Sequence, residues 1–340
     1  MTKKTKPVLH SQQDFADVLG HIQHARQTVF AQVNTALIDL YWQIGEIISD
    51  KVSSAAWGKS IVSDLATYIA QQDPELKGFS DKNLWRMKQF FETYQSDEKL
   101  SPVVRELPWT HNTIIMSRCK SVEEREYYLN LCIKERYSKR ELERQISSSH
   151  FERVMLGNQK ISAVLRELHP KINNTLKDNY VLEFLGLPLQ HSESHLQRAL
   201  INNMKHFMLE LGKDFIFVGE EYRLQVGNQD FYIDLLFFHR GLAALVAFEL
   251  KMGKFSPEHL GQLNFYLEAL DRDVRKPHEN PSIGVLLCRD KDEEVVEYAL
   301  SRNLSPTMVA QYELQLPDKK LIQAKLHELS ESGFWTQTND

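Results

Sequence analysis

The chain has 340 residues, of which 42% are hydrophobic and 26% charged, and its formal net charge is -5. This composition is typical of an ordinary soluble protein and argues against long disordered stretches, while the length favours two domains. The negative total neither excludes nor supports nucleic-acid binding, because phosphates require local patches of positive charge.

Three cysteines lie far apart and show no metal-ligand spacing, so we expect free thiols in a reducing compartment (Cys119, Cys132 and Cys288). The N-terminal segment Met1–Pro7 is basic, but no apolar run follows it, so no secretory signal is expected. No segment approaches 18 apolar residues, and we expect no membrane span. The cytoplasm is therefore the expected compartment.

The first half of the chain is predicted to be helical almost throughout. Apolar residues recur at steps of three, four and seven between Phe15 and Ile48, which indicates an amphipathic helix or a pair of helices. Trp57-Gly58 interrupts this pattern, and a second helix is expected over residues 61–71. Several short helices with brief connections predict an all-helical domain over residues 10–155.

Two later segments carry helix-start signals. Ser80 is a candidate N-cap for a helix that continues to Tyr94, and Ser138-Lys-Arg-Glu141 has the form of a capping box. Either helix could be the groove-reading helix of a helix-turn-helix, or its charges could simply face water. The basic residues concerned are Lys82, Arg86 and Lys88 in the first segment and Lys139, Arg140 and Arg144 in the second.

Residues 156–190 are expected to be a connecting region with its own helix, and residues 191–330 a second domain. After a helix over 196–212, aromatic and branched residues predict strands, then a helix, a strand and a helix. The expected order of elements in this domain is α-β-β-β-α-β-α. The expected strands cover 215–218, 231–238, 243–248 and 283–288, and the later helices cover 259–270 and 293–300.

A candidate site lies at the end of the third of these strands. In Glu249-Leu-Lys251 the carboxylate and the ammonium are two residues apart, so they project from the same face. If His239 pairs with Leu242 around a tight turn, Asp234 stands opposite Ala247. It then lies one diagonal from Glu249, roughly 7 Å between backbones. Two carboxylates at that reach can share one divalent cation.

The surroundings of these acids favour a site. Asp234 is embedded in the apolar run Tyr232–Phe238, where a carboxylate is costly unless it is paired or binds a metal. Hard oxygen ligands suit Mg²⁺, with Mn²⁺ as the alternative. Such an ion would activate water and polarise a phosphoryl oxygen, and Lys251 would orient the water or neutralise developing charge. The competing interpretation is a plain ion pair between Asp234 and Lys251.

The chain contains its own comparison for this triplet. Glu75-Leu-Lys77 has the same letters, but Pro74 precedes it, Gly78 follows it, and no strand acid lies upstream. We expect it to be a loop without chemistry. The Glu-x-Lys pattern alone is therefore weak, and the preceding strand and Asp234 make the difference.

Three further residues are candidates near the same site. A Gly227-Asn228 hairpin would place Glu221 opposite Asp234, which makes Glu221 the better third acid unless the register slips by one residue. Gln262 and Tyr266 share one helix face and could hydrogen-bond a phosphate or order the lysine, or Tyr266 could simply pack on the sheet.

His191, Glu193 and His195 form a separate alternating cluster. It could bind zinc only if the segment were extended, and the sequence offers no fourth ligand nearby. We do not expect a metal site there.

Several stretches of the chain form a recognisable set. In the second half they are Phe231-Tyr-Ile-Asp-Leu-Leu-Phe-Phe238, Phe248-Glu-Leu-Lys251, Gly261-Gln-Leu-Asn-Phe-Tyr-Leu267 and Pro281-Ser-Ile-Gly-Val-Leu-Leu-Cys288. In the first half they are Tyr41-Trp-Gln-Ile-Gly45, Trp57-Gly58, Gly78-Phe-Ser80 and Leu107-Pro-Trp109. With this set the chain resembles the YhcG-type PD-(D/E)XK nucleases, which have a helical N-terminal domain of unknown function.

The resemblance implies an α/β restriction-endonuclease-like core, a mixed central sheet flanked by helices, with a magnesium site. In that site Asp234, Glu249 and Lys251 would be catalytic. Gln262 and Tyr266 resemble the Q-x-x-x-Y element of the RecB-like branch. Many relatives carry an acid on the first helix of this domain, whereas this chain has Gln197 there, with Glu193 before or at the helix start. The number of metal ions therefore stays open.

The function expected on this basis is metal-dependent hydrolysis of DNA by an endonuclease, with the helical domain binding DNA or a partner. A homodimer is expected, because one site cuts one strand at a time, and proteins of a defence system are possible partners by analogy only. The alternative is a non-catalytic DNA-binding or assembly subunit of a restriction or defence system.

Overall fold

The computed structural model describes residues 10–54, 59–157, 159–170, 172 and 175–331. The chain divides into two compact units, residues 1–143 and 144–340, and each is described by itself. Trp57-Gly58, where a break was expected, lies outside the described residues. No helix in these described ranges is long and apolar enough to cross a membrane.

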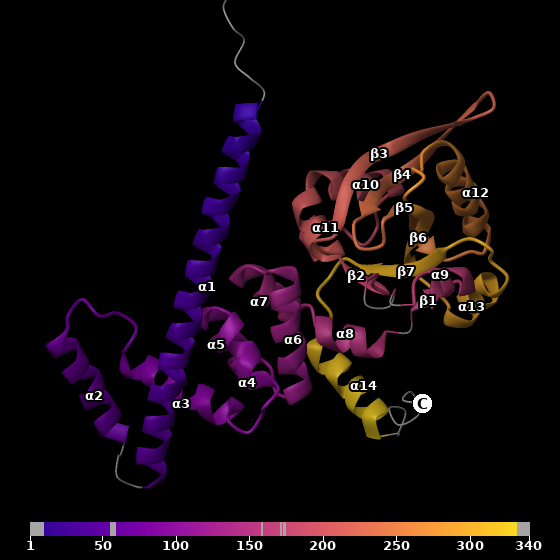
Figure 1. Cartoon of the computed structure of the whole chain (residues 1–340). Coiled ribbons are helices and arrows are strands. Elements are labelled where there is room, and N and C mark those ends of the chain that lie inside the picture. The colour runs from indigo at the N-terminus through magenta and orange to yellow at the C-terminus, as the bar shows by residue number, and fades with distance from the viewer. Residues whose placement is uncertain (1–9, 55–58, 158, 171, 173–174, 332–340) are drawn as a thin grey trace, which may run out of the picture. The chain divides into compact units, whose positions relative to one another are not determined.

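The first unit is helical wherever the structure describes regular secondary structure (Figure 1). Its elements are α1 (His10–Ser53), α2 (Lys59–Gln72), α3 (Asp81–Tyr94), α4 (Leu100–Val103), η1 (Val104–Glu106), α5 (Trp109–Arg118) and α6 (Val122–Glu135). The long apolar pattern of the N-terminal region thus forms one continuous helix, α1, rather than a pair.

Close packing of α1 on α3 organises this unit. Ile38, Tyr41 and Ile48 are buried on α1. Gly45 lies among them, and a Cβ there would collide with the backbone carbonyl of Met87 on α3. Only glycine therefore permits this approach of the two helices.

Both predicted helix starts are confirmed. The Ser80 side chain accepts a hydrogen bond from the backbone N–H of Asn83 and begins α3. The Ser138 hydroxyl accepts one from the N–H of Glu141, 3.3 Å away, at the start of α7 (Lys139–Ser147). Each bond satisfies one of the free N–H groups of a first helical turn.

The second unit contains a mixed sheet in the order β1-β7-β6-β5-β4-β3, with β2 also on β7. Strand β4 is antiparallel to its two neighbours, β3 and β5, and β5, β6 and β7 are parallel. The strands are β1 (Lys160–Ile161), β2 (Asn179–Val181), β3 (Phe215–Val226), β4 (Gln229–His239), β5 (Ala244–Lys254), β6 (Asn280–Asp290) and β7 (Thr307–Glu313).

Helices cover both faces of this sheet (Figure 1). One face packs on α9 (Ala163–Leu168), α10 (Glu193–Asn202) and α11 (Met204–Leu211), and the other on α12 (Glu258–Asp273) and α13 (Glu293–Ser301). Burial on both faces explains why β5 and β6 are almost continuously apolar. The expected fold, a mixed sheet flanked by helices after a helical region, is confirmed.

Three expectations need correction. Besides the expected helix, α9, residues 156–190 contain the strands β1 and β2, and Leu165 and Tyr180 join the sheet core. The helix expected over 196–212 breaks at Asn203 into α10 and α11. The strand β7 was missed, although its residues 307–310 are fully buried, because its apolar run is short.

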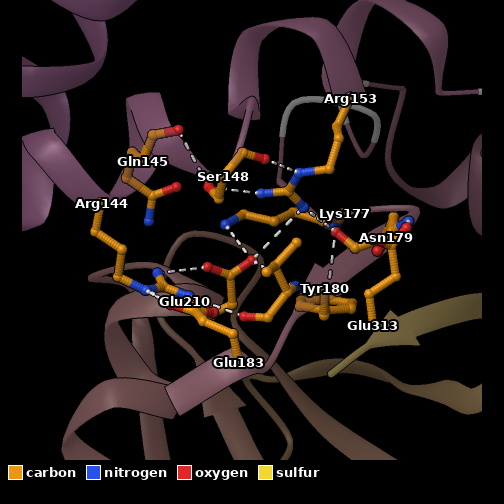
Figure 2. A network of polar contacts seen from close by, with 11 residues as sticks. Arg144, Gln145, Ser148, Arg153, Lys177, Asn179, Tyr180, Glu183, Glu210 and Glu313 are labelled. Atoms are coloured by element: carbon orange, nitrogen blue, oxygen red, sulfur yellow. Dashed lines mark hydrogen bonds and ion pairs between the residues drawn. The ribbon is translucent and has the colours of Figure 1, made fainter. Parts of the chain in front are cut away.

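Within the second unit, a buried charge network joins Arg144 at the end of α7 and Arg153 on α8 (His150–Leu156) to Glu210 on α11 (Figure 2). Glu210 on α11 has no solvent exposure and lies 2.9 Å from Arg144, 3.3 Å from Lys177 and 3.8 Å from Arg153. Burial acts to raise the pKa of Glu210, but the three cations outweigh it and lower this pKa to about 2. Arg144 also binds Glu183 in η3 (Glu183–Leu185) at 2.8 Å.

Candidate functional site

Two chain reversals set the register of the strands that carry the site. Val226 pairs with Gln229, which confirms the two-residue hairpin at Gly227-Asn228. His239 pairs with Ala244 rather than Leu242, so the second turn is two residues longer than predicted. An even shift of this kind leaves each residue on its face and moves it along the strand.

The longer turn brings Asp234 nearer to Glu249 than predicted. Leu235 pairs with Phe248, so the register continued by one residue sets Asp234 opposite Glu249 instead of Ala247. The Asp234 carboxylate accepts a hydrogen bond of 2.7 Å from the backbone N–H of Leu250. Burial raises the pKa of Asp234, which this hydrogen bond and the charge of Lys251 partly oppose.

Glu249 is the most deeply buried group of the site, with 2% exposure. Its Oε1 accepts a hydrogen bond of 2.9 Å from Lys251 Nζ, while its Oε2 is buried and has no partner. Burial, followed by the charge of Asp234, raises the pKa of Glu249 to about 7. The site thus contains more negative charge than its own lysine balances.

Lys251 lies between two acids. Its ammonium group is 2.9 Å from Glu249 and 3.5 Å from Glu193. Burial acts to lower the pKa of Lys251, but these carboxylates outweigh it and the pKa is raised. The lysine is therefore a cation at neutral pH and can serve as an electrostatic group rather than a base.

Helix α10 contributes to the site from its first turn. Glu193 is its first residue, and besides facing Lys251 it accepts a hydrogen bond from the N–H of Met252 at 3.3 Å. Gln197, one turn later, donates to the backbone carbonyl of Asp234 at 3.2 Å. An acid from this helix is thus present, although one turn earlier than the position occupied by Gln197.

The cluster His191, Glu193 and His195 does not converge. His191 contacts the carbonyl of Pro188 and the hydroxyl of Tyr312, while His195 is exposed on α10. The start of a helix at Glu193 ends the alternating geometry that a zinc site would require.

Helix α12 covers the site from the other face. Gln262 donates to the Tyr266 hydroxyl at 2.7 Å. Tyr266 is 4% exposed, and burial raises its pKa, with a further contribution from Glu249. His259, at the start of the same helix, was not among the predicted site residues. Burial lowers its pKa, and the charge of Lys251 lowers it further, so His259 lies within electrostatic reach of the site. Its position one helical turn before Gln262 could have predicted that it lies on the same helix face.

The predicted third acid, Glu221, occupies the expected register but not a buried position. Tyr222 pairs with Ile233, which sets Glu221 opposite Asp234. Glu221 is exposed and has φ of 44°, an unusual value for a residue other than glycine. Its charge contributes to the raised pKa of Asp234, so it lies within electrostatic reach of the site.

The same letters elsewhere lead to a different structure. Glu75-Leu-Lys77 lies in a loop after α2, where Lys77 donates to the carbonyl of Pro74 at 3.1 Å and the triplet is exposed. The expectation of a loop is confirmed. Glu249-Leu-Lys251 on β5 differs from this exposed triplet because Glu249 is buried and Asp234 faces it from β4.

The residues fit a hard divalent cation. Two carboxylates have raised pKa values, and a buried oxygen of Glu249 has no partner, so a cation would satisfy both. Within the described ranges no group of three His, Cys, Asp or Glu side chains is arranged to hold a metal. Mg²⁺ commonly binds through one or two carboxylates and keeps several waters, which suits this pair.

The PD-(D/E)XK class of nuclease domains is defined by a mixed sheet with helices on both faces. One strand of the sheet carries an acid, and its neighbour carries an acid and a lysine two residues apart. Residues 173–327 match the family model described as YhcG PDDEXK nuclease domain, and residues 17–153 match the DUF1016 N-terminal domain. The chain belongs to the YhcG family of PD-(D/E)XK nucleases.

Comparison with individual proteins gives one relative in Escherichia coli (strain K12), named "Putative nuclease YhcG". It is 32% identical over 352 residues, which cover 93% of each chain. Among solved structures, a repair endonuclease from Pyrococcus abyssi matches with a TM-score of 0.27 and 16% identity. That match covers 38% of this chain and 49% of the endonuclease.

Proposed function

We propose that this protein is a divalent-metal-dependent DNA endonuclease. The observation that carries the proposal is the pair formed by the half-buried Asp234 and the buried Glu249 beside the cationic Lys251, with one Glu249 oxygen unsatisfied. Such a pair gains most from a divalent ion, and phosphodiester hydrolysis is chemistry for which these three groups suffice. Mg²⁺ is the first choice and Mn²⁺ the second.

Each residue has a distinct part in this proposal. Asp234 and Glu249 would hold the metal, which supplies an activated water and a polarised phosphoryl oxygen when bound. The ammonium group of Lys251 would stabilise negative charge on the phosphate as the bond to the leaving oxygen breaks. Gln262 and Tyr266 would orient the phosphate, and their mutual hydrogen bond fixes the tyrosine hydroxyl.

The additional acids have supporting parts. Glu193 faces Lys251 and would keep its ammonium group in place, or complete the metal sphere after a rotamer change. Glu221 stands at the exposed side of Asp234 and would interact with metal-bound water.

The test is cleavage of plasmid, single-stranded and branched DNA with Mg²⁺, Mn²⁺ or EDTA. We expect cleavage that needs the metal and falls by at least about 100-fold in Asp234→Ala and Lys251→Ala, with DNA binding retained. Lys77→Ala, in the exposed triplet Glu75-Leu-Lys77, is the matched control and should cleave normally. Failure of the unmodified protein to cut any substrate with any metal would leave only the alternative, a non-catalytic DNA-binding or assembly subunit.

For the helical unit we propose contact with DNA or a partner protein. Lys82 and Arg86 on α3 are exposed, as are Lys139 and Arg140 on α7. Arg144 is unsuited to this role, because its guanidinium is engaged by Glu183 and Glu210. Lys82→Glu together with Arg86→Glu should weaken DNA binding in a salt-dependent manner if α3 faces phosphates.

Three broader proposals accompany this function. Cutting of both strands would require two sites, so a homodimer is expected and sedimentation can test it. The described cysteines are free and buried, which suits the cytoplasm. Partner proteins of a defence system would be identified by co-purification.

A further inference from the structure

A small pocket lies on the same sheet edge as the candidate catalytic residues. It has a volume of 290 Å³ and is lined from β6, β7 and the segments beside them. Its walls include two half-exposed leucines, Leu189 and Leu316, and its polar groups include Arg289 and Gln315. This volume is close to the lower end of small-ligand sites, about 300 Å³, so the pocket suits a single nucleotide unit rather than a duplex.

Strand pairing fixes the distance from this pocket to the catalytic lysine. Lys251 pairs with Cys288, and Cys288 pairs with Gln311, a pocket residue, so the three lie in one row across the sheet. Neighbouring strands are about 4.8 Å apart, which places the backbone of Gln311 roughly 10 Å from that of Lys251. A strand bound at the catalytic residues could therefore reach the pocket.

The pocket is also built in a defined shape. Tyr312, one of its lining residues, is 1% exposed and shares a hydrogen bond of 3.1 Å with His191. His191 in turn contacts the Pro188 carbonyl at 3.0 Å. Arg289 donates to the carbonyl of Leu189 at 2.5 Å, which fixes the guanidinium at the wall while other N–H groups remain available.

The lining suits both parts of a nucleotide. The guanidinium of Arg289 can bind a phosphate or stack on a base, and the leucines offer an apolar surface for the base. Gln315 and Glu313 can hydrogen-bond the polar edge of the base, and the carboxylate of Glu313 disfavours a second phosphate beside it. A base can enter such a pocket only when it is unpaired and unstacked.

We propose that this pocket binds a nucleobase of an unpaired DNA strand next to the scissile position, so that the enzyme acts on DNA with single-stranded parts. This inference rests on the proposed nuclease function and names its substrate class. Residues of β6 and β7 thereby select the substrate, while those of β4 and β5 cut it.

The experiment measures binding by fluorescence anisotropy with the full chain in EDTA, so that it does not depend on cleavage. The probes are a labelled single-stranded oligonucleotide, a forked duplex and a blunt duplex of the same sequence. Arg289→Ala should weaken binding to the first two by about fivefold or more, as expected for the loss of one base contact, and leave the blunt duplex unchanged. Arg272→Ala, on the exposed face of α12, is the control and should change none of them.

A second variant guards against misfolding at Arg289. Leu316→Trp at the pocket mouth fills the cavity and should weaken binding to unpaired strands alone, whereas Leu304→Trp, 87% exposed elsewhere, should not. Equal weakening on blunt duplex and single strands, or no weakening in either pocket variant, would overturn the pocket proposal. That result would leave the proposed metal-dependent cleavage untouched. Conversely, a protein that binds these probes as proposed but cleaves no DNA would contradict the nuclease function and not the binding of unpaired strands.

Discussion

The unsatisfied carboxylate of Glu249 should make the metal-free protein less stable than a variant without it. Its pKa rises from the ordinary 4.5 to about 7 on folding, which corresponds to about 3.5 kcal/mol as an upper bound, at about 1.4 kcal/mol per pKa unit. Between these pH values the folded chain binds more protons than the unfolded chain, so stability falls as the pH rises. Glu249→Gln removes this penalty while it keeps the shape of the side chain.

We therefore expect Glu249→Gln to abolish cleavage and to raise the stability of the metal-free protein at pH 8 by about 1–3 kcal/mol. At about 2–4 °C per kcal/mol, thermal unfolding followed by circular dichroism in EDTA can resolve this gain. At pH 5, just above the ordinary pKa of 4.5, Glu249 is protonated in the folded chain and only partly ionised in the unfolded chain, so the gain should fall below about 1 kcal/mol. Mg²⁺ should raise the unfolding temperature of the wild type at pH 8 and leave that of the variant nearly unchanged.

Glu268→Gln is the matched control, because that side chain is 61% exposed on α12 and should alter stability little at either pH. The reasoning would be refuted by a Glu249→Gln variant that is less stable than the wild type at pH 8. A gain of the same size at pH 5 and pH 8 would also refute it, since it would show that the charge is not responsible.

Three further substitutions test the fold. Glu210→Gln leaves three buried cations around a neutral group and should lower the free energy of unfolding in urea by about 3–5 kcal/mol. In the wild type the pKa of Glu210 is lowered to about 2, so the stability that this carboxylate contributes should be complete above pH 4.5 and be lost as the pH falls towards 2. Ser80→Ala removes the cap of α3 and should cost about 1 kcal/mol. Gly45→Ala should cost about 1–3 kcal/mol in thermal unfolding, because its methyl group meets the Met87 carbonyl.

Local chemistry in the sequence determined much of this protein. The hydroxyl of Ser80 and the Gly227-Asn228 pair act on their immediate neighbours, so their helix start and hairpin were predictable. The alternation of strand residues likewise set Glu249 and Lys251 on one face, and the structure pairs them at 2.9 Å. Burial on both sides made the later strands recognisable by their apolar runs.

Only the tertiary structure decided which residues complete the site. The turn after His239 is longer than its two obvious turn residues suggest, and this moved Asp234 from Ala247 to Glu249. Glu193 reaches Lys251 because α10 packs across the sheet, a contact between residues 58 positions apart that no local pattern encodes. The same holds for Arg144, whose charge reads as a DNA contact in sequence and is buried against Glu210 in the fold. Sequence periodicity specifies which face a side chain occupies, whereas the lengths of turns and the packing of distant elements specify which side chains meet.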